Sequence, residues 1–168
     1  MHAVIGLGSN LGDRAATLQS AVDALARSEG IAVIAVSPVY ETPAVGPPQP
    51  AYLNAAARIE TELGPDALME ALLAIEAAHG RIRREKWGPR TLDLDVLVLW
   101  DPARDAVITV ETGSVRAPHP HLLERTFALA PLLDVMPELA PAYGGTLSAL
   151  GGAPARGSQS VVVPRRHR

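Results

Sequence analysis

Two aspartates at the head of an apolar run are the residues best placed to do chemistry in this chain. Asp93 and Asp95 stand near the start of residues 92–100, whose other members are leucine, valine and a final tryptophan. This pattern is typical of a buried strand. Residues two apart on a strand point to the same face, with Cα atoms about 6.6 Å apart. Carboxylates in such a run need partners to offset desolvation, and metal ions or arginines are the candidates.

A cationic segment precedes the two acids. Residues 80–90 hold a cluster of basic side chains interrupted by glycine and proline, namely Arg81, Arg83, Arg84, Lys86 and Arg90. The planar guanidinium of arginine suits paired hydrogen bonds to phosphate oxygens. Cations beside a carboxylate pair therefore favour a metal-bound polyphosphate as the ligand. The simpler alternatives are an acid pair that solvates a sheet edge and a basic loop that faces water.

The length and composition of the chain limit the classes of protein to which it can belong. A length of 168 residues predicts one domain with a core of its own, and we place that domain at 1–150, followed by a loosely ordered tail at 151–168. The net charge of -3 disfavours nucleic-acid binding through the overall field. The absence of cysteine, of a signal-like start and of a membrane-length apolar run favours a soluble cytoplasmic protein.

The hydrophobic pattern predicts the element order strand, helix, strand, strand, helix, strand. Asp13 is expected to cap the first helix, and residues 42–50 are too rich in proline for helix or central strand. The six elements are expected at 4–7, 14–30, 31–40, 52–61, 65–80 and 92–100. This order predicts a ferredoxin-like α/β plait in the α+β class, with an antiparallel sheet of four main strands, room for one or two extra edge strands, and helices packed on it.

Later elements are expected to be short. Residues 106–110 read as an edge strand, 117–122 as an irregular segment leading into a helix that carries Arg125 and Phe127, and 161–163 as one added strand. Within 52–61 the alternation places Tyr52 and Asn54 on the face opposite the apolar residues. An aromatic ring and an amide thus share one face at the start of that strand.

Several motifs together resemble one family, the 6-hydroxymethyl-7,8-dihydropterin pyrophosphokinases of folate biosynthesis. The resemblance covers about residues 4–139. It rests on Gly8-Ser9-Asn10-Leu11-Gly12, Tyr40-Glu41-Thr42-Pro43, Tyr52-Leu53-Asn54, Gly80-Arg81-Ile82-Arg83, Trp87-Gly88-Pro89-Arg90-Thr91-Leu92-Asp93-Leu94-Asp95 and Pro118-His119-Pro120. Gly8-Ser9-Asn10 lacks the P-loop pattern and is expected to shape the pocket floor instead.

The resemblance implies transfer of the β,γ-diphosphate of ATP to the hydroxymethyl oxygen of the dihydropterin, leaving AMP. It implies that Asp93 and Asp95 hold two Mg²⁺ ions and that Arg81 and Arg90 assist catalysis. The residues matching ATP contacts are Glu76, Arg81, Arg83, His119 and Arg125. Those matching pterin contacts are Thr42, Pro43, Val45, Tyr52, Asn54, Trp87 and Phe127, with Trp87 placed to close over the pocket.

The expected partners are therefore the small molecules ATP and 6-hydroxymethyl-7,8-dihydropterin, with no nucleic acid, no membrane and a monomeric chain. The sequence departs from the family pattern at Leu73 and at residues 114–116, which leaves the adenine contacts open. Two alternatives remain from the residues themselves. One is another metal-dependent nucleotidyl- or glycosyltransferase with paired aspartates, and the other is an RNA-binding plait, which the low aromatic content disfavours.

Overall fold

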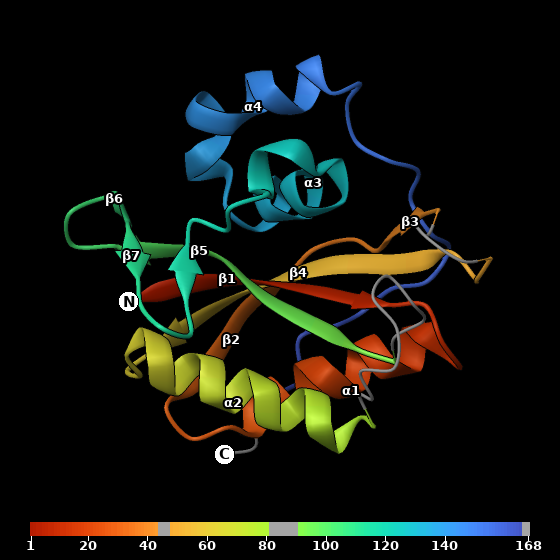
Figure 1. Ribbon diagram of the computed structural model, residues 1–168, viewed down its shortest axis with the longest axis horizontal. Helices are drawn as coiled ribbons and strands as arrows, with labels where there is room; N and C mark the ends of the chain where they lie inside the picture. Colours follow the sequence, from red (N-terminus) through yellow and green to blue (C-terminus); the bar gives the residue numbers. More distant parts are fainter. Residues whose placement is uncertain (44–47, 81–90, 166–168) are drawn as a thin grey trace.

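The structure is a mixed α/β arrangement in which one antiparallel sheet lies between two layers of helices (Figure 1). The computed structural model describes residues 1–43, 48–80 and 91–165. Within these ranges the main sheet has the strand order β2-β4-β1-β5-β6, and β3 pairs with β4 beyond the end of β2. None of the helices in the described ranges has the length and apolar character needed to cross a bilayer.

The strands of the main sheet are β1 (His2–Ser9), β2 (Ile31–Val36), β3 (Tyr40–Thr42), β4 (Tyr52–Thr61), β5 (Asp93–Asp101) and β6 (Ala106–Ile108). A small second sheet pairs β7 (Val110–Glu111) with β8 (Arg116–Ala117). The α-helices are α1 (Arg14–Arg27), α2 (Pro65–Ala78), α3 (Thr126–Val135) and α4 (Ala140–Ala149), and short 3₁₀ turns stand at Leu122–Glu124 and Pro137–Leu139.

Two hydrophobic cores form because side chains along each strand point alternately to the two faces of the sheet. Helices α1 and α2 cover one face of the sheet, while α3 and α4 lie over the other (Figure 1). Leu53, Ala55 and Ile59 of β4 face the α1 and α2 side, as their spacing predicts, and Ala56 faces α3. In β1, Ile5 and Leu7 follow the first group and Val4 follows the second.

A β-bulge in β5 changes the face to which its side chains point. Val4 of β1 pairs with Val98 and Ile5 pairs with Val96, so Leu97 is the extra residue. Leu94 and Val96 pack into the α1 and α2 core, whereas Leu97 and Val98 both join the α3 core. Before the bulge, the odd-numbered residues of β5 point to the α3 side of the sheet.

The predicted strands and helices of the sheet layer are largely confirmed. Asp13 caps α1, since its Oδ1 accepts from the backbone N–H of Ala16 at 3.1 Å. The predicted strand at 31–40 is wrong in one respect, because it is interrupted between β2 and β3. There the backbone N–H and side-chain Oγ of Ser37 bond to the C=O and N–H of Ala56, at 2.8 Å each, and Pro38 follows with no N–H to donate.

The C-terminal part also differs from expectation. Helix α4 was not predicted, and residues 161–163 form no strand in the described structure. Residues 151–165 instead run past β3, where Tyr40 and Arg156 form an isolated antiparallel bridge, and continue to the α1 side of the sheet. The prediction that this segment is loosely ordered concerns its motion, and it stays a prediction.

Tyr40 joins β3 to α3, and this link yields a test of the fold. The buried phenol donates a hydrogen bond to Asp134, and burial raises the pKa of Tyr40 to about 12, with that hydrogen bond acting in the same direction. A raised pKa favours the protonated phenol in the folded state, so its contribution is complete below pH 10 and lost as the pH rises toward 12.

We expect Tyr40→Phe to lower the free energy of unfolding by about 1 kcal/mol at pH 7, the usual value of one hydrogen bond. Urea unfolding followed at pH 7, 10 and 11.5 measures this loss. The wild type should lose stability between the two higher pH values more steeply than the variant. Parallel curves for the two proteins would contradict the assignment.

Candidate functional site

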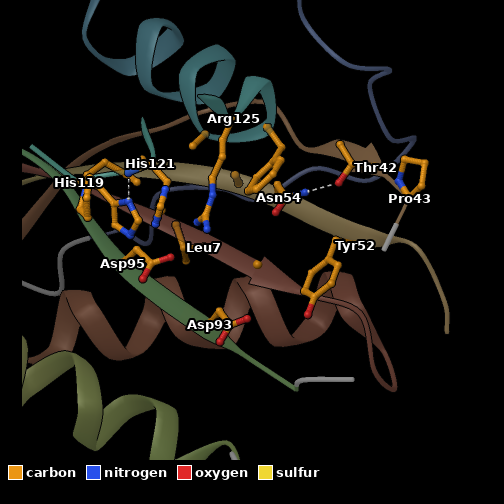
Figure 2. Close-up of a pocket in the computed structure, with 17 residues that line it drawn as sticks. Leu7, Thr42, Pro43, Tyr52, Asn54, Asp93, Asp95, His119, His121 and Arg125 are labelled. Carbon is orange, nitrogen blue, oxygen red and sulfur yellow. Dashed lines mark hydrogen bonds between the residues drawn. The ribbon is translucent and has the colours of Figure 1, made fainter. Parts of the chain in front are cut away.

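A cavity of about 650 Å³ lies on the α3 side of the sheet, between the strands and the start of α3. Figure 2 shows its polar side chains converging from several elements: Asp93 and Asp95 from β5, Tyr52 and Asn54 from β4, and Arg125 from the N-terminal end of α3. The cavity therefore draws on segments that are far apart in the sequence.

The floor of the cavity follows from the register of three neighbouring strands. Gly8 of β1 pairs with Asn54 on one side and with Asp93 on the other, and Gly6 pairs with Ala56 and Asp95. The amide of Asn54 and the two carboxylates thus stand on opposite sides of a strand that contributes no side chain at these positions. A flat molecule has room to lie across this strand.

Gly8 lets the Asn54 amide and the Tyr52 ring lie close to the backbone of β1, and a larger residue here would displace them. A Cβ atom at this position would lie 3.2 Å from Oδ1 of Asn54 and 3.6 Å from the Tyr52 ring. Asn54 is itself only 6% exposed, and its Nδ2 donates to Oγ1 of Thr42 at 2.8 Å. The amide therefore has little freedom to move away.

At the acidic end, the bulge in β5 helps to place a histidine. The carbonyl of Leu97 accepts from the backbone N–H of His119 at 2.8 Å, which holds the His119 loop beside the strand that carries Asp95. The ring Nδ1 of His119 accepts from the backbone N–H of His121 at 3.1 Å, so Nε2 carries the proton in the neutral ring. Burial lowers the pKa of His119, with Arg125 acting in the same direction and Asp95 opposing it.

At the other end, an aromatic ring remains open to the cavity. Phe127, on the first turn of α3, is 36% exposed and lines the cavity. The guanidinium of Arg125 lies 5.7 Å from the centre of that ring. Two planar groups, Phe127 and Tyr52, are thus available to contact a flat ligand.

The two carboxylates suit a hard divalent cation whose remaining ligands come from water or substrate. Asp93 and Asp95 are half-buried, project from one face of β5, and both line the cavity. Among the described residues, no group of three or more His, Asp or Glu side chains is arranged to hold a metal ion by itself. Mg²⁺ commonly takes one or two carboxylates and completes its shell with water and substrate phosphate oxygens.

Comparison with known proteins identifies the family. A family model for 7,8-dihydro-6-hydroxymethylpterin-pyrophosphokinase matches residues 4–137. The chain belongs to this family. Its function is accordingly the transfer of diphosphate from ATP to hydroxymethyldihydropterin in folate biosynthesis, with ATP as co-substrate.

Curated relatives support this family membership, and a solved structure shares the fold. A protein named 2-amino-4-hydroxy-6-hydroxymethyldihydropteridine pyrophosphokinase from Methylorubrum extorquens is 46% identical over 139 residues, which cover 82% of this chain and 84% of that protein. One of the same name from Bacillus subtilis is 43% identical over 134 residues, covering 79% and 77%. A structure of Plasmodium falciparum HPPK-DHPS has a TM-score of 0.58 at 14% identity, covering 89% of this chain and 44% of that one, and so shares the fold.

The cavity brings together most of the residues that the sequence singled out. Those lining it are Thr42, Pro43, Tyr52, Asn54, Asp93, Asp95, His119, Arg125 and Phe127. Of Gly8-Ser9-Asn10, expected to shape the floor, Gly8 lines the cavity and the buried Ser9 and Asn10 do not. His121 lines the cavity without having been predicted. No sequence signal distinguished His121 from an ordinary loop residue. The predictions for Val45, Arg81, Arg83, Trp87 and Arg90 fall outside the described residues.

The structure does not bring Glu76 into the cavity, although the family resemblance placed it at the ATP end. Glu76 is 2% exposed on α2, and its Oε2 accepts from the backbone N–H of Leu94 at 2.9 Å. Leu94 lies between Asp93 and Asp95. The carboxylate therefore fixes the stretch of β5 that carries both acids, from the opposite face of the sheet.

We expect Glu76→Leu to lower the free energy of unfolding by about 1–3 kcal/mol, because the buried N–H of Leu94 loses its acceptor. Glu76→Gln retains a side-chain oxygen and should lose less. Urea unfolding of the three proteins at pH 7 measures the difference. Equal stability of the leucine and glutamine variants would rule out this role of the hydrogen bond.

Proposed function

We propose that this cavity is the active site, in which the β,γ-diphosphate of ATP passes to the hydroxymethyl oxygen of 6-hydroxymethyl-7,8-dihydropterin and AMP is left. The observation that carries the proposal is the row formed by Asn54, Gly8 and Asp93 across β4, β1 and β5. A pterin lying on the glycine floor has the amide at its ring edge. Its hydroxymethyl group can then extend toward the acids.

The pterin end provides both stacking and hydrogen bonding. Tyr52 and Phe127 offer aromatic faces, and a flat bicyclic ring gains from stacking on them. Asn54 presents an amide already oriented by Thr42, which suits a ring edge with alternating donors and acceptors. Pro43, next to Thr42, lines the same end, and Val45 and Trp87 are assigned to it on the family resemblance.

The phosphate end provides carboxylates and cations. Asp93 and Asp95 would hold the Mg²⁺ ions, two by family resemblance, and these ions would neutralise phosphate charge and orient the reacting groups. The Nε2–H of His119 and the guanidinium of Arg125 are donors suited to phosphate oxygens. On the family resemblance, Arg81, Arg83 and Arg90 contact the triphosphate, and Arg81 and Arg90 support the transition state.

We also propose a fold type, a domain extent, an oligomeric state and a location for the protein. The element order β1-α1-β2-β4-α2-β5 and the strand order β2-β4-β1-β5 support the ferredoxin-like plait with four main strands, to which β3 and β6 add at the edges. Residues 1–150 would form a single catalytic domain. We also propose a monomeric chain, and the absence of cysteine supports a cytoplasmic location.

We expect Asp95→Asn to lower the rate of AMP formation on the order of a thousandfold, because one carboxylate of the metal pair is lost. The assay supplies MgCl₂, ATP and 6-hydroxymethyl-7,8-dihydropterin and separates AMP from ADP. Asp101→Asn is the matched control, since Asp101 ends the same strand away from the cavity, and it should retain wild-type activity.

The products decide between this reaction and the alternatives. AMP that forms only when the dihydropterin is present supports diphosphate transfer. ADP as the product, or a wild-type chain that forms no AMP, would overturn the proposed function. Full activity of Asp95→Asn would overturn the assignment of Asp95 to the metal site but would leave the proposed reaction standing.

We expect Gly8→Ala to raise the KM for the dihydropterin at least tenfold while the KM for ATP changes little. The new methyl group meets the Asn54 amide at 3.2 Å and occupies the floor on which the ring lies. Gly64→Ala is a suitable control, because its Cβ would meet no atom within 4 Å. If Gly8→Ala raises both KM values alike, the floor does not separate the two substrates as proposed.

A further inference from the structure

The wall of the cavity beside Asn54 is the end of β3, a strand of three residues. β3 pairs with β4 along one edge, Tyr40 opposite Asn54 and Thr42 opposite Tyr52. Its last residue, Thr42, accepts the hydrogen bond from Asn54 Nδ2. The position of β3 therefore decides where the Asn54 amide points.

The other edge of β3 is bonded to the C-terminal segment. The backbone N–H of Glu41 donates to the carbonyl of Ala155 at 2.8 Å, and that of Gly157 donates to the carbonyl of Val39 at 2.9 Å. The guanidinium of Arg156 lies 5.9 Å from the centre of the Tyr40 ring. A strand this short gains a second ladder from residues 155–157, and it would otherwise be an open edge.

A second anchor lies further along the same segment. Val161 is 8% exposed and belongs to the core on the α1 side of the sheet. The side-chain amide of Gln19, on α1, bonds to both backbone groups of Val162: its Nε2 donates to the carbonyl at 3.0 Å, and its Oε1 accepts from the N–H at 2.9 Å. The segment thus bridges β3 and α1.

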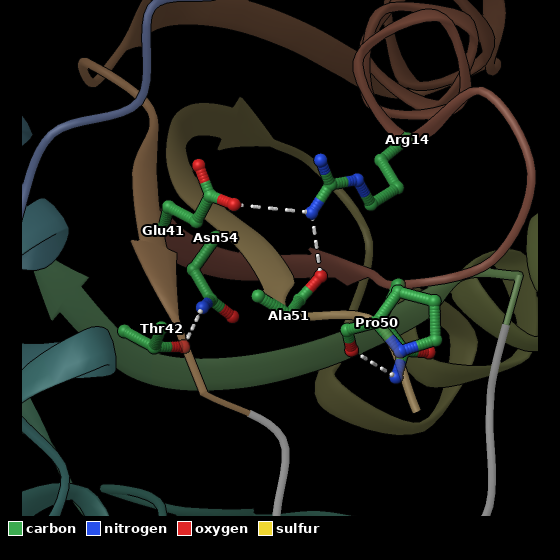
Figure 3. Close-up of polar contacts among 7 residues, drawn as sticks. Arg14, Glu41, Thr42, Pro50, Ala51 and Asn54 are labelled. Atoms are coloured by element: carbon green, nitrogen blue, oxygen red, sulfur yellow. Dashed lines mark hydrogen bonds and ion pairs between the residues drawn. The ribbon is translucent and has the colours of Figure 1, made fainter. Parts of the chain in front are cut away.

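Arg14 also reaches this region, but its link to β3 is weaker. Its Nη1 lies 3.5 Å from Oε1 of Glu41 and donates to the carbonyl of Ala51 at 2.7 Å (Figure 3). The first contact is long and partly exposed, so it contributes little. The second holds the residue before β4 rather than β3. The backbone bonds to residues 155–157 are the firmer support of the β3 edge.

We propose that residues 153–163 act as a strap that holds β3 in place and thereby sets the affinity for the dihydropterin, leaving the nucleotide end unaffected. The inference rests on the proposed function of the cavity. The strap lies beyond residues 4–137, the region that the family model matches. Both β4 and β1 lie between β3 and the acids of β5, so loosening β3 affects the two substrates unequally.

The test compares Gly157→Pro with Gly157→Ala. Both add a Cβ, which would meet the flexible end of Gln159 at 2.8 Å and Val39 at 3.5 Å. Only proline removes the N–H that donates to Val39. We expect Gly157→Pro to raise the KM for the dihydropterin about fivefold, the effect of one lost hydrogen bond, with unchanged kcat and KM for ATP. Gly157→Ala should stay within twofold of wild type.

Hydrogen exchange at the Glu41 amide reports whether the strap has been released, because that N–H donates to Ala155. If its protection persists in Gly157→Pro, the double variant Gln19→Ala/Gly157→Pro releases both anchors and is assayed in the same way. Faster exchange at Glu41 with an unchanged KM for the dihydropterin overturns the strap, as does an equal rise in both KM values. A wild-type chain that forms no AMP instead overturns the proposed function.

Discussion

The site depends on the antiparallel pairing of β1 with both β4 and β5. Because side chains alternate along a strand, the register decides which residues of three strands share one face. Here it aligns Gly8 with Asn54 and Asp93, and Gly6 with Ala56 and Asp95. A shift of one residue would turn the acids or the amide toward the α1 and α2 core. The close-packed backbone of β1 is therefore as much a part of the site as any polar side chain.

Hydrogen bonds on both faces of the sheet hold the strands in this register. On the α1 and α2 face, Glu76 holds Leu94 between the two acids. On the α3 face, the bulge at Leu97 provides a carbonyl for the loop that carries His119. At the far edge, β3 fixes the Asn54 amide through Thr42. Each support acts through the backbone or through a buried group, which suits positions that must hold small distances.

The sequence predicted the sheet layer because it depends on local patterns, and it predicted most of the cavity because its motifs resemble one family. Alternation placed Tyr52 and Asn54 correctly, and the spacing of Asp93 and Asp95 placed both acids on one face. The inward-facing role of Glu76 was missed because it depends on a contact between α2 and β5 that no spacing reveals. The bulge at Leu97 was also missed, since nothing in an unbroken apolar run marks which residue is extra. Helix α4 was missed because its Gly-Gly pair disfavours helix locally, whereas in the structure its partly buried Tyr143 and Leu147 pack against the α3 core.

The bulge also divides β5 into two parts whose side chains have different roles on the α3 side of the sheet. Residues before Leu97 carry the acids toward the cavity, and those after it send Val98 and Trp100 into the core beneath α3. An uninterrupted strand would place one parity of residues on the α3 side throughout, so catalytic and packing side chains would compete for a single alternating pattern. One inserted residue removes that conflict. On the α3 side, the acid-bearing positions and the core-packing positions of one strand therefore occupy separate stretches.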